Sequence, residues 1–397
     1  MSWENTYLTY SAALREVPRP TAFVDLEALE ENIQKVLKYS GDRPIRLATK
    51  SIRCLPLLKD IQAASSRFIG FMTFSARESL YLSQQGLNDF LIGYPFMQAA
   101  EVKAYVELRQ QGKRAIAMVD SFEQAEAISY GLRGTKLEGL VCLDVDASSD
   151  WGWLYFGVRR SPLRWEEGVL ALAQSLRRLE NIRIVGVMAY EAQIAGLPDR
   201  GMGLKTPLVR FLKRRSWQEV QKRRQAIVAA LRDAGFALEF VNGGGTGSLP
   251  LTASDPSVTE VTAGSAFFAP ALFDGYTGVQ FRPAAGFSLE ITRRPAENIF
   301  TCHGGGYVAS GAAGPEKLPR PWLPPTARLL PHEGAGEVQT PVHIPNPPAF
   351  LRPGEPLYFR HAKAGELCQR FPLLHLIRQD KLMGFYSTYA TLPHAWV

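Results

Sequence analysis

Cysteine is scarce in this chain, and its distribution excludes several kinds of site. The 397 residues include four cysteines, Cys54, Cys142, Cys302 and Cys368, and none of them forms a C-x-x-C pair. Such spacing fits neither a zinc ribbon nor a disulfide framework. It favours reduced thiols, so we expect a cytoplasmic protein.

Long apolar runs are also lacking. No stretch approaches the roughly 18 residues that a membrane-spanning helix needs. The N-terminal stretch MSWENTYLTYSAALREV has neither the basic segment nor the apolar segment of a signal peptide. With 46% hydrophobic and 21% charged residues, the composition is that of an ordinary globular protein. We therefore expect no membrane partner.

Basic residues outnumber acidic ones, 45 to 38, but no nucleic-acid-binding motif accompanies them. The densest basic run is LKRRSWQEVQKRR, residues 212–224, and the apolar residues in and around it fall roughly on one helical stripe. We interpret the run as the solvated polar face of a helix. No nucleic-acid partner is expected.

Short apolar segments alternate with helical ones through the first 280 residues. The apolar segments, interpreted as strands, are TAFVDL (21–26), PIRLATK (44–50), FIGFMTF (68–74), DFLIGYPF (89–96), AIAMVD (115–120), LEGLVCLDVDA (137–147), NIRIVGVMAY (181–190) and ALEFVNGGG (237–245). Continuous apolar runs are typical of buried parallel strands, which need crossover helices. Eight such units most economically close into a (β/α)8 TIM barrel, and an open doubly wound sheet is the alternative.

The pattern changes at about residue 281, where β-rich runs separated by glycine and proline turns replace the helical periodicity. We therefore predict an α/β protein in three parts. Residues 1–20 form an N-terminal segment compatible with joining the β domain. Residues 21–280 form the barrel, and residues 281–397 form a C-terminal antiparallel β domain.

The strongest local signal is EFVNGGGTGSLP, residues 239–250. Three consecutive glycines, then Thr246, Gly247 and Ser248, follow a strand end. Glycine lets the backbone approach a ligand closely, and the hydroxyl groups add donors, so the segment suits a phosphate. It is neither a Walker loop nor a dinucleotide-binding G-x-G-x-x-G. A flexible turn is the alternative.

A second glycine–hydroxyl cluster, Gly264 and Ser265, follows about 20 residues later. In barrels of this type the loops after the last two strands often share a phosphate site. Lys50 ends a strand-like run, where a charge costs free energy unless something uses it. A strand-end lysine with a phosphate cup suits pyridoxal phosphate (PLP), which needs one Schiff-base amine and one phosphate anchor. An exposed lysine is the alternative.

An ordered set of segments carries a family resemblance. PTAFVDLEALEENI, RLATKS, GVMAYEA, NGGGTGS and TEVTAGS resemble the barrel of the alanine-racemase-like PLP enzymes of fold type III. Within that group the chain is most similar to the D-threonine aldolase and D-serine dehydratase branch, and to bacterial proteins described as amino acid deaminase/aldolase. The C-terminal stretches CHGGGYVASG, EGAGEVQTP and RHAKAGELC extend the likeness over nearly the whole chain.

The resemblance implies a PLP-dependent lyase that acts on a small β-hydroxy amino acid of D configuration. The reaction would be retro-aldol cleavage, or dehydration followed by deamination. An amino acid racemase of the same fold and a non-catalytic PLP-binding protein are the alternatives. Substrate identity depends on pocket shape, which residue types do not give.

The resemblance also implies roles for single residues. Lys50 would hold PLP through a Schiff base and then act as a base. Tyr190 would line the pocket near the substrate or the ring. Arg159 would reach the cofactor or the lysine, although the family's usual arginine spacing is absent, and a surface ion pair is its alternative. The phosphate would be held by Gly244, Gly245, Thr246, Gly264 and Ser265.

Members of that branch also use a divalent metal, bound by His-x-Cys or His-x-Asp in the C-terminal domain. This chain has His361-Ala362-Lys363 at the corresponding place, and a protonated lysine cannot bind a metal. Either the Lys363 ammonium takes over part of the metal's electrostatic work, or Glu366 or Cys368 completes a metal site with His361. We favour the first explanation, which makes a divalent metal doubtful. A structural role is the alternative for His361.

Fold type III enzymes are commonly dimers in which each site combines one subunit's barrel with the other's β domain. The resemblance therefore implies a homodimer. The glycine-rich segment CHGGGYVASG, residues 302–311, is a candidate for contact with the partner's barrel, and a simple glycine-rich hairpin is the alternative.

Overall fold

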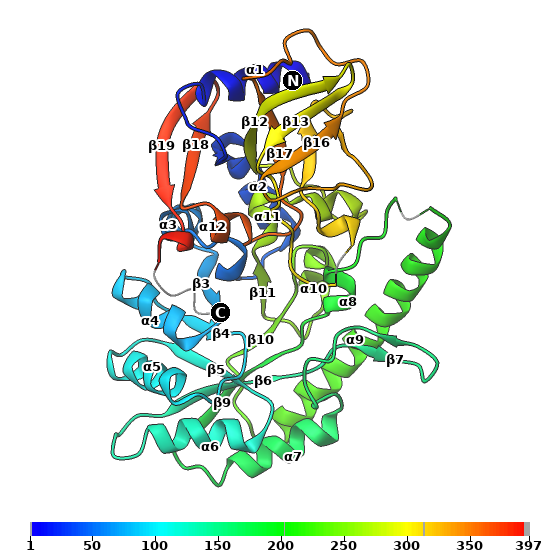
Figure 1. Cartoon of the computed structure of the whole chain (residues 1–397). Coiled ribbons are helices and arrows are strands. Elements are labelled where there is room, and N and C mark those ends of the chain that lie inside the picture. Colours follow the sequence, from blue (N-terminus) through cyan, green and yellow to red (C-terminus); the bar gives the residue numbers. More distant parts are fainter. Residues whose placement is uncertain (1, 202, 313, 393–397) are drawn as a thin grey trace.

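The computed structural model describes residues 2–201, 203–312 and 314–392. It contains a closed parallel barrel and a separate, mostly antiparallel sheet. In Figure 1 the barrel occupies the lower part of the molecule and the sheet the upper part. The predicted fold class, a TIM barrel with a β domain, is confirmed.

Eight parallel strands close the barrel in the order β10-β11-β2-β3-β4-β5-β6-β9. Their bounds are β2 (Ile45–Ala48), β3 (Phe68–Thr73), β4 (Phe90–Ile92), β5 (Ala115–Val119), β6 (Gly139–Asp144), β9 (Ile182–Met188), β10 (Phe240–Gly243) and β11 (Glu260–Ala263). Every residue of β4, β5 and β6 is buried. This burial explains why their sequences are apolar nearly throughout rather than alternating.

Helices follow the barrel strands, and all but the last, α11, lie between one barrel strand and the next. They are α3 (Leu55–Ala63), α4 (Ala76–Gln84), α5 (Ala99–Gln110), α6 (Phe122–Gly131), α7 (Glu166–Leu176), α8 (Ala192–Ala195), α9 (Thr206–Asp233), α10 (Leu249–Ser254) and α11 (Ser265–Phe268). Side-chain caps fix two of the starts: the Ser75 hydroxyl accepts the Glu78 N–H at 3.1 Å, and the Ser121 hydroxyl accepts the Gln124 N–H at 3.4 Å. Among the helices of the described residues, none has the length and apolarity to span a bilayer.

One predicted barrel strand lies in the other domain. The run TAFVDL forms β1 (Thr21–Asp25), which pairs antiparallel with β12 (Ala285–Ala296) and parallel with β18 (Leu373–Arg378). Its place in the barrel is taken by β11, from the TEVTAGS segment. A fully buried strand has the same apolar pattern in either sheet, so periodicity could not distinguish the two positions. Helix α2 (Leu26–Tyr39) leads from β1 to the barrel.

The β domain combines β1 with the C-terminal part of the chain in a nine-stranded sheet. Its other strands are β12, β13 (Ile299–His303), β14 (Arg320–Leu323), β15 (Arg328–Leu329), β16 (Gln339–His343), β17 (Pro356–Arg360), β18 and β19 (Lys381–Ser387). Helix α1 (Trp3–Ala13) packs on this sheet: the Tyr7 hydroxyl donates to the Pro356 carbonyl at 2.9 Å, and the Tyr10 hydroxyl donates to Asp25 at 2.8 Å. The N-terminal residues therefore pack against the β domain, as Figure 1 shows for α1.

Candidate active site

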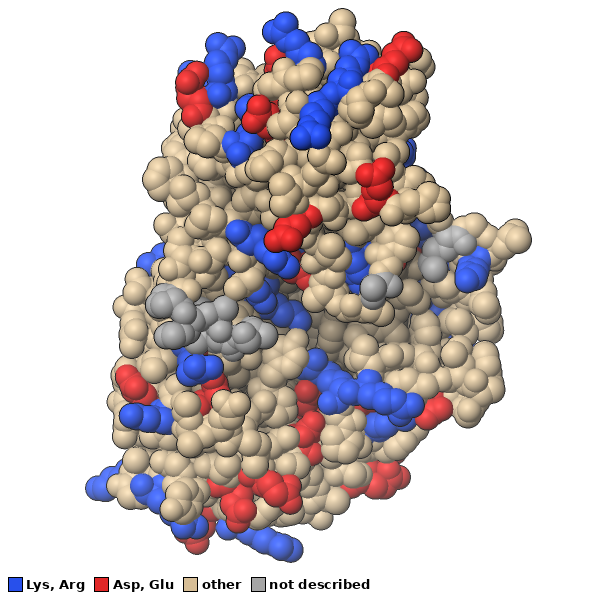
Figure 2. Space-filling model, in the orientation of Figure 1, with Lys and Arg blue, Asp and Glu red and all other residues tan. Residues whose placement is uncertain are grey.

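A cavity of about 710 Å³ lies at the carboxyl ends of the barrel strands, where β-domain residues also line it. This end is where barrels of this type place their chemistry. Figure 2 shows the hollow between the two domains on one face, with lysine and arginine side chains along its border. The site is therefore built jointly by the barrel and the β domain of one chain.

Lys50 lies in a short 3-10 helix (Thr49–Ser51) directly after β2, and its side chain lines the cavity. Its Nζ donates to the Tyr94 hydroxyl at 2.7 Å. Burial acts to raise the pKa of Tyr94, but the nearby Lys50 ammonium and Arg160 guanidinium outweigh it and hold that pKa below its ordinary value. The Lys50 amine thus lies where a molecule bound in the cavity can reach it.

Two glycine–hydroxyl loops adjoin one another in the wall of the cavity. The Thr246 hydroxyl accepts the Ala266 N–H at 3.0 Å, which ties the first loop to the second. The hydroxyls of Ser51 and Ser265 lie 3.4 Å apart, which joins the second loop to the turn that carries Lys50. The cavity is lined by all five predicted phosphate residues, Gly244, Gly245, Thr246, Gly264 and Ser265.

At two of these glycines a side chain would overlap neighbouring atoms of the cavity wall. A Cβ on Gly245 would lie 2.9 Å from Tyr190 Cε2, and one on Gly264 would lie 2.8 Å from Ala48 Cβ. Gly244 has φ +88°, a conformation that glycine adopts without strain. The backbone can therefore approach a bound anion closely at this point.

Tyr190 follows β9 and lines the same cavity. Burial, reinforced by the Glu191 carboxylate, raises the pKa of Tyr190 to about 12. Its hydroxyl is therefore protonated near neutral pH and can donate a hydrogen bond.

Arg53 and Arg160 line the cavity, and the predicted Arg159 does not. Arg159 is exposed and stacks on the Tyr155 ring at 4.3 Å. Arg160 lines the cavity, its Nε lies 2.9 Å from both Asp144 carboxylate oxygens, and its guanidinium also donates to the Gly93 carbonyl at 2.8 Å. The two arginines are neighbours in an irregular segment, and only the Arg160 side chain reaches the cavity.

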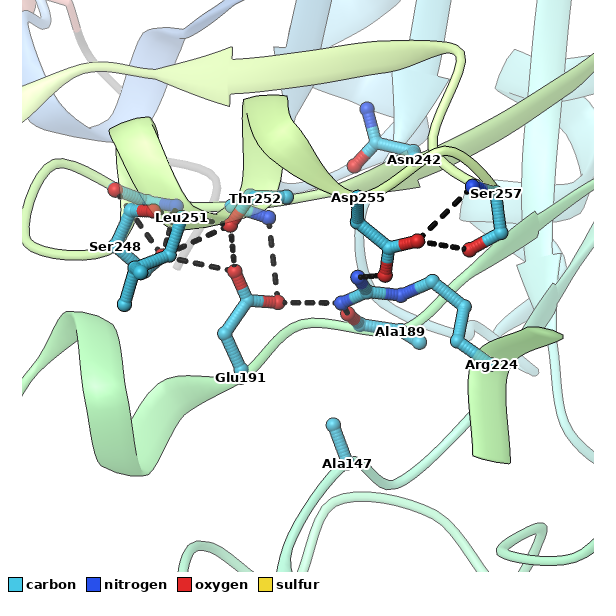
Figure 3. A network of polar contacts seen from close by, with 12 residues as sticks. Ala147, Ala189, Glu191, Arg224, Asn242, Ser248, Leu251, Thr252, Asp255 and Ser257 are labelled. Atoms are coloured by element: carbon cyan, nitrogen blue, oxygen red, sulfur yellow. Dashed lines mark hydrogen bonds and ion pairs between the residues drawn. The ribbon is translucent and has the colours of Figure 1, made fainter. Parts of the chain in front are cut away.

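A buried network around Glu191 and Arg224 contacts the first glycine loop; Figure 3 shows Glu191 with Ser248, Thr252 and Arg224. Glu191 accepts hydrogen bonds from the Ser248 hydroxyl at 2.8 Å, from the Thr252 hydroxyl, and from the Gly244 N–H at 3.4 Å. Its other main partner is Arg224, which donates to it at 2.8 Å. The carboxylate therefore fixes the loop by consuming donors on the side away from the cavity.

The predicted solvated basic run is in part buried. Arg224 of α9 also donates to Asp255 at 2.7 Å and to the Ala189 carbonyl at 2.8 Å. Lys213 and Arg223 are buried as well. The Lys213 side chain donates to the Leu197 carbonyl, and the Arg223 side chain donates to the Ser148 carbonyl. The interpretation as a solvated face is wrong for these three residues, because loops at the mouth of the barrel fold acceptors against the helix.

The β-domain side of the cavity includes Lys363 and Glu366, and it excludes the predicted metal ligands His361 and Cys368. His361 is 4% exposed, both its ring nitrogens lack a hydrogen-bond partner among the described residues, and Phe268 packs edge-on against it at 6.1 Å. Burial, aided by Arg360, lowers the pKa of His361 to about 3. Cys368 is fully buried in α12 (Leu367–Arg370), away from the cavity lining, and burial raises the pKa of its thiol.

The residues present do not fit a metal centre of the predicted kind. Within the described ranges, no three His, Cys, Asp or Glu side chains cluster closely enough to hold a metal ion. His361 and Glu366 do line a common small cavity of about 10 Å³, but Cys368 does not. These residues therefore support no metal-dependent step.

One end of the glycine-rich segment 302–311 adjoins this chain's own cavity. Ser310 lines the cavity, and its N–H donates to Glu366 at 2.7 Å. Tyr307 packs between Phe287 and Phe371, with ring centroids 5.1 and 4.9 Å away.

Sequence reasoning missed Tyr94, Arg160 and Ser310. Tyr94 stands at the carboxyl end of a predicted strand, just as Lys50 does, and that position was a usable signal. Ser310 had no comparable signal, because its place depends on how the β domain packs on the barrel.

Comparisons with known proteins agree with this architecture. Residues 24–270 match the family model described as alanine racemase, N-terminal domain. The chain is 22% identical over 258 residues to a 3-hydroxy-D-aspartate aldolase of Paracoccus denitrificans, and the aligned region covers 64% of this chain and 61% of that protein. It is 25% identical over 263 residues to a D-threonine aldolase of Arthrobacter, covering 64% and 62%. The match thus spans about three fifths of these curated relatives.

Solved structures extend the likeness to the β domain. The D-threonine aldolase from Filomicrobium marinum superposes with a TM-score of 0.81 at 18% identity, covering 94% of this chain and 95% of that one. The D-threo-3-hydroxyaspartate dehydratase from Delftia gives a TM-score of 0.74 at 19% identity, covering 95% and 98%. At such low identity these likenesses establish the shared fold. Because the family model spans more than half of its length, the chain belongs to the alanine racemase N-terminal domain family.

Proposed function

We propose that this protein is a PLP-dependent lyase acting on a small β-hydroxy amino acid of D configuration. The observation that carries the proposal is the position of Lys50, whose amine shares one cavity with the two glycine–hydroxyl loops. A strand-end amine beside an anion cup matches a cofactor that joins an aldehyde to a phosphate. The aldolase and dehydratase names of the similar proteins support the reaction class.

The residues of the cavity fit PLP. Lys50 would hold the aldehyde carbon and afterwards move a proton at Cα. The phosphate would lie against Gly244, Gly245, Thr246, Gly264 and Ser265. PLP, when bound, withdraws the electron pair left at Cα after a bond there breaks.

Three further side chains would act around the substrate. The Tyr190 hydroxyl would donate a hydrogen bond to the substrate or ring, and Arg160 would place a fixed positive charge near Tyr94 and Lys50. The Lys363 ammonium would face the β-oxygen. His361 would act indirectly, by filling the space behind the Lys363 turn.

We also propose a homodimer in the cytoplasm. Trp153, Leu208 and Phe211 are 70%, 56% and 52% exposed, and Trp153 stands in the β7–β8 hairpin (Ser149–Asp150 and Tyr155–Phe156), whose second strand lines the cavity. Apolar exposure of this kind at the edge of a site supports a subunit contact. Light scattering coupled to gel filtration would test it, and a monomer at all concentrations would contradict it.

Absorbance and peptide mapping test the cofactor. Purified protein mixed with PLP should turn yellow, and borohydride should fix the cofactor to Lys50, with Lys50→Ala as the control. A protein that stays colourless, or one labelled elsewhere, would contradict the proposal.

A substrate panel tests the reaction. D-Threonine, D-serine and 3-hydroxy-D-aspartate, each beside its L enantiomer, would be scored for aldehyde, ammonia and keto acid. Interconversion of enantiomers without cleavage would instead establish a racemase. Yellow protein with no turnover would establish a PLP carrier.

A further inference from the structure

One charged turn of the β domain faces the cavity. Among its lining residues in the described part of the chain, Glu366 is the only acidic one. Glu366 Oε1 accepts the Ser310 N–H at 2.7 Å, and Lys363 Nζ donates to the Ser310 carbonyl at 3.3 Å. The backbone N–H and carbonyl of Ser310 thus hold the Glu366 carboxylate and the Lys363 ammonium close to each other at the cavity wall.

The turn is fixed directly on the backbone of Lys50. Gly365, between the two charged residues, has φ +90°. A Cβ at that position would lie 2.0 Å from the Lys50 carbonyl oxygen and 3.5 Å from Ser51 Cα. Only glycine fits so close an approach, so the position of the charged turn relative to Lys50 is set by backbone packing.

Chemistry at the β-carbon needs an acid–base group, and this turn supplies a carboxylate. A β-hydroxyl must lose its proton for cleavage or gain one to leave as water, which calls for an acid–base group within hydrogen-bond reach. Tyr190, with a pKa of about 12, is a poor base near neutral pH, and arginine does not deprotonate in proteins. Tyr94 is engaged with the Lys50 amine. Glu366 remains as the carboxylate whose second oxygen accepts no hydrogen bond from the described residues.

We propose that Glu366 is the acid–base residue for the β-hydroxyl and that Lys363 stabilises negative charge on the β-oxygen, so that turnover needs no divalent cation. This proposal rests on the proposed lyase function. In cleavage, the Glu366 carboxylate takes the hydroxyl proton, the β-carbon and oxygen become a carbonyl, and the Cα–Cβ electron pair stays with Cα. In dehydration, Lys50 removes the Cα proton, and protonated Glu366 gives its proton to the hydroxyl, which leaves as water with the Cβ–O electron pair.

The experiment compares the holoenzyme variants Glu366→Gln and Lys363→Met with Glu316→Gln. Glu316 is an exposed carboxylate of the same domain, paired with Lys317 at 3.5 Å, and it serves as the matched control. Turnover of the best β-hydroxy substrate should fall about 100- to 10,000-fold in Glu366→Gln and at least about tenfold in Lys363→Met. The visible absorbance of bound PLP, and exchange of the D-alanine α-proton in D2O, should stay within about twofold of the wild type.

Metal content gives the second readout. After dialysis against EDTA the wild type should keep full turnover, and calorimetric titration with Zn²⁺ or Mn²⁺ should show no site that depends on Glu366. Full turnover by Glu366→Gln would overturn the proposal. So would turnover that is lost with EDTA and restored only by a divalent ion, with a titratable site that disappears in His361→Ala or Glu366→Gln.

Different results would overturn the role of Glu366 and the proposed lyase function. A wild type that binds PLP and cleaves or dehydrates its substrate, with Glu366→Gln equally active, would overturn this proposal alone. A wild type that never takes up PLP would overturn both.

Discussion

Replacing Arg224 with methionine would leave two buried carboxylates without their cation. The side chains of Arg224, Glu191 and Asp255 are at most 1% exposed, and the guanidinium contacts both carboxylates and the Ala189 carbonyl. Removing one partner of a buried ion pair costs about 3–5 kcal/mol, and an unpaired buried acceptor costs about 1–3 kcal/mol. Because the two costs overlap, we expect Arg224→Met to lower the unfolding free energy by about 4–6 kcal/mol.

Urea unfolding followed by far-ultraviolet circular dichroism would measure this loss. The matched control is Arg214→Met, an exposed arginine of the same helix, which should change the unfolding free energy by less than about 0.5 kcal/mol. A triple variant, Arg224→Met with Glu191→Gln and Asp255→Asn, removes the buried charges and should recover at least half of the loss. An unfolding free energy of Arg224→Met within about 1 kcal/mol of the wild type would contradict this role for Arg224, and so would a triple variant no more stable than the single one.

Three further predictions concern burial, packing and the choice of arginine. Burial raises the pKa of Glu78 to about 7, so Glu78 contributes stability that is complete below its unfolded pKa of about 4.5 and is lost as pH rises to about 7. The unfolding free energy of Glu78→Gln, measured with urea relative to the wild type, should therefore rise by about 3 kcal/mol between pH 4.5 and 8. An unfolding free energy that changes with pH equally in both proteins would contradict this. Gly365→Ala should abolish PLP absorbance, because the new Cβ would overlap the Lys50 carbonyl; Gly354→Ala, at a similar φ of +94° but in open space, should leave it unchanged. Arg160→Ala should reduce kcat/KM about 100-fold or more, as expected for a lost charge in the site, whereas Arg159→Ala should stay within about twofold; equal losses would count against the placement of Arg160.

Sequence reasoning reached the barrel and most of the cavity because both follow from local patterns. A strand end puts Lys50 and Tyr190 at one edge of the barrel, and consecutive glycines mark a close backbone approach wherever the loop lies. These features depend on neighbours in sequence, so the five phosphate residues could be chosen without a structure. Their roles toward PLP stay predictions.

The predictions were wrong where a side chain's surroundings depend on residues that are distant in the sequence. Arg224 belongs to a basic run like any solvated one, and only the folded loops bring Glu191 and Asp255 to it. His361 lies where the resemblance places a metal ligand, yet it is buried against Phe268 and does not line the large cavity. Arg159 and Arg160 differ only in direction, which an irregular segment does not reveal.

Strand β1 has a consequence for how the chain folds during synthesis. It lies between β12 and β18, whose residues follow it by more than 250 positions. While a ribosome makes the barrel, both edges of β1 stay unpaired and exposed, and the upper sheet cannot assemble until its last strands emerge. A fragment starting near residue 281 would lack the strand that joins its two halves, so we expect it to aggregate unless residues 1–25 are supplied as a separate peptide.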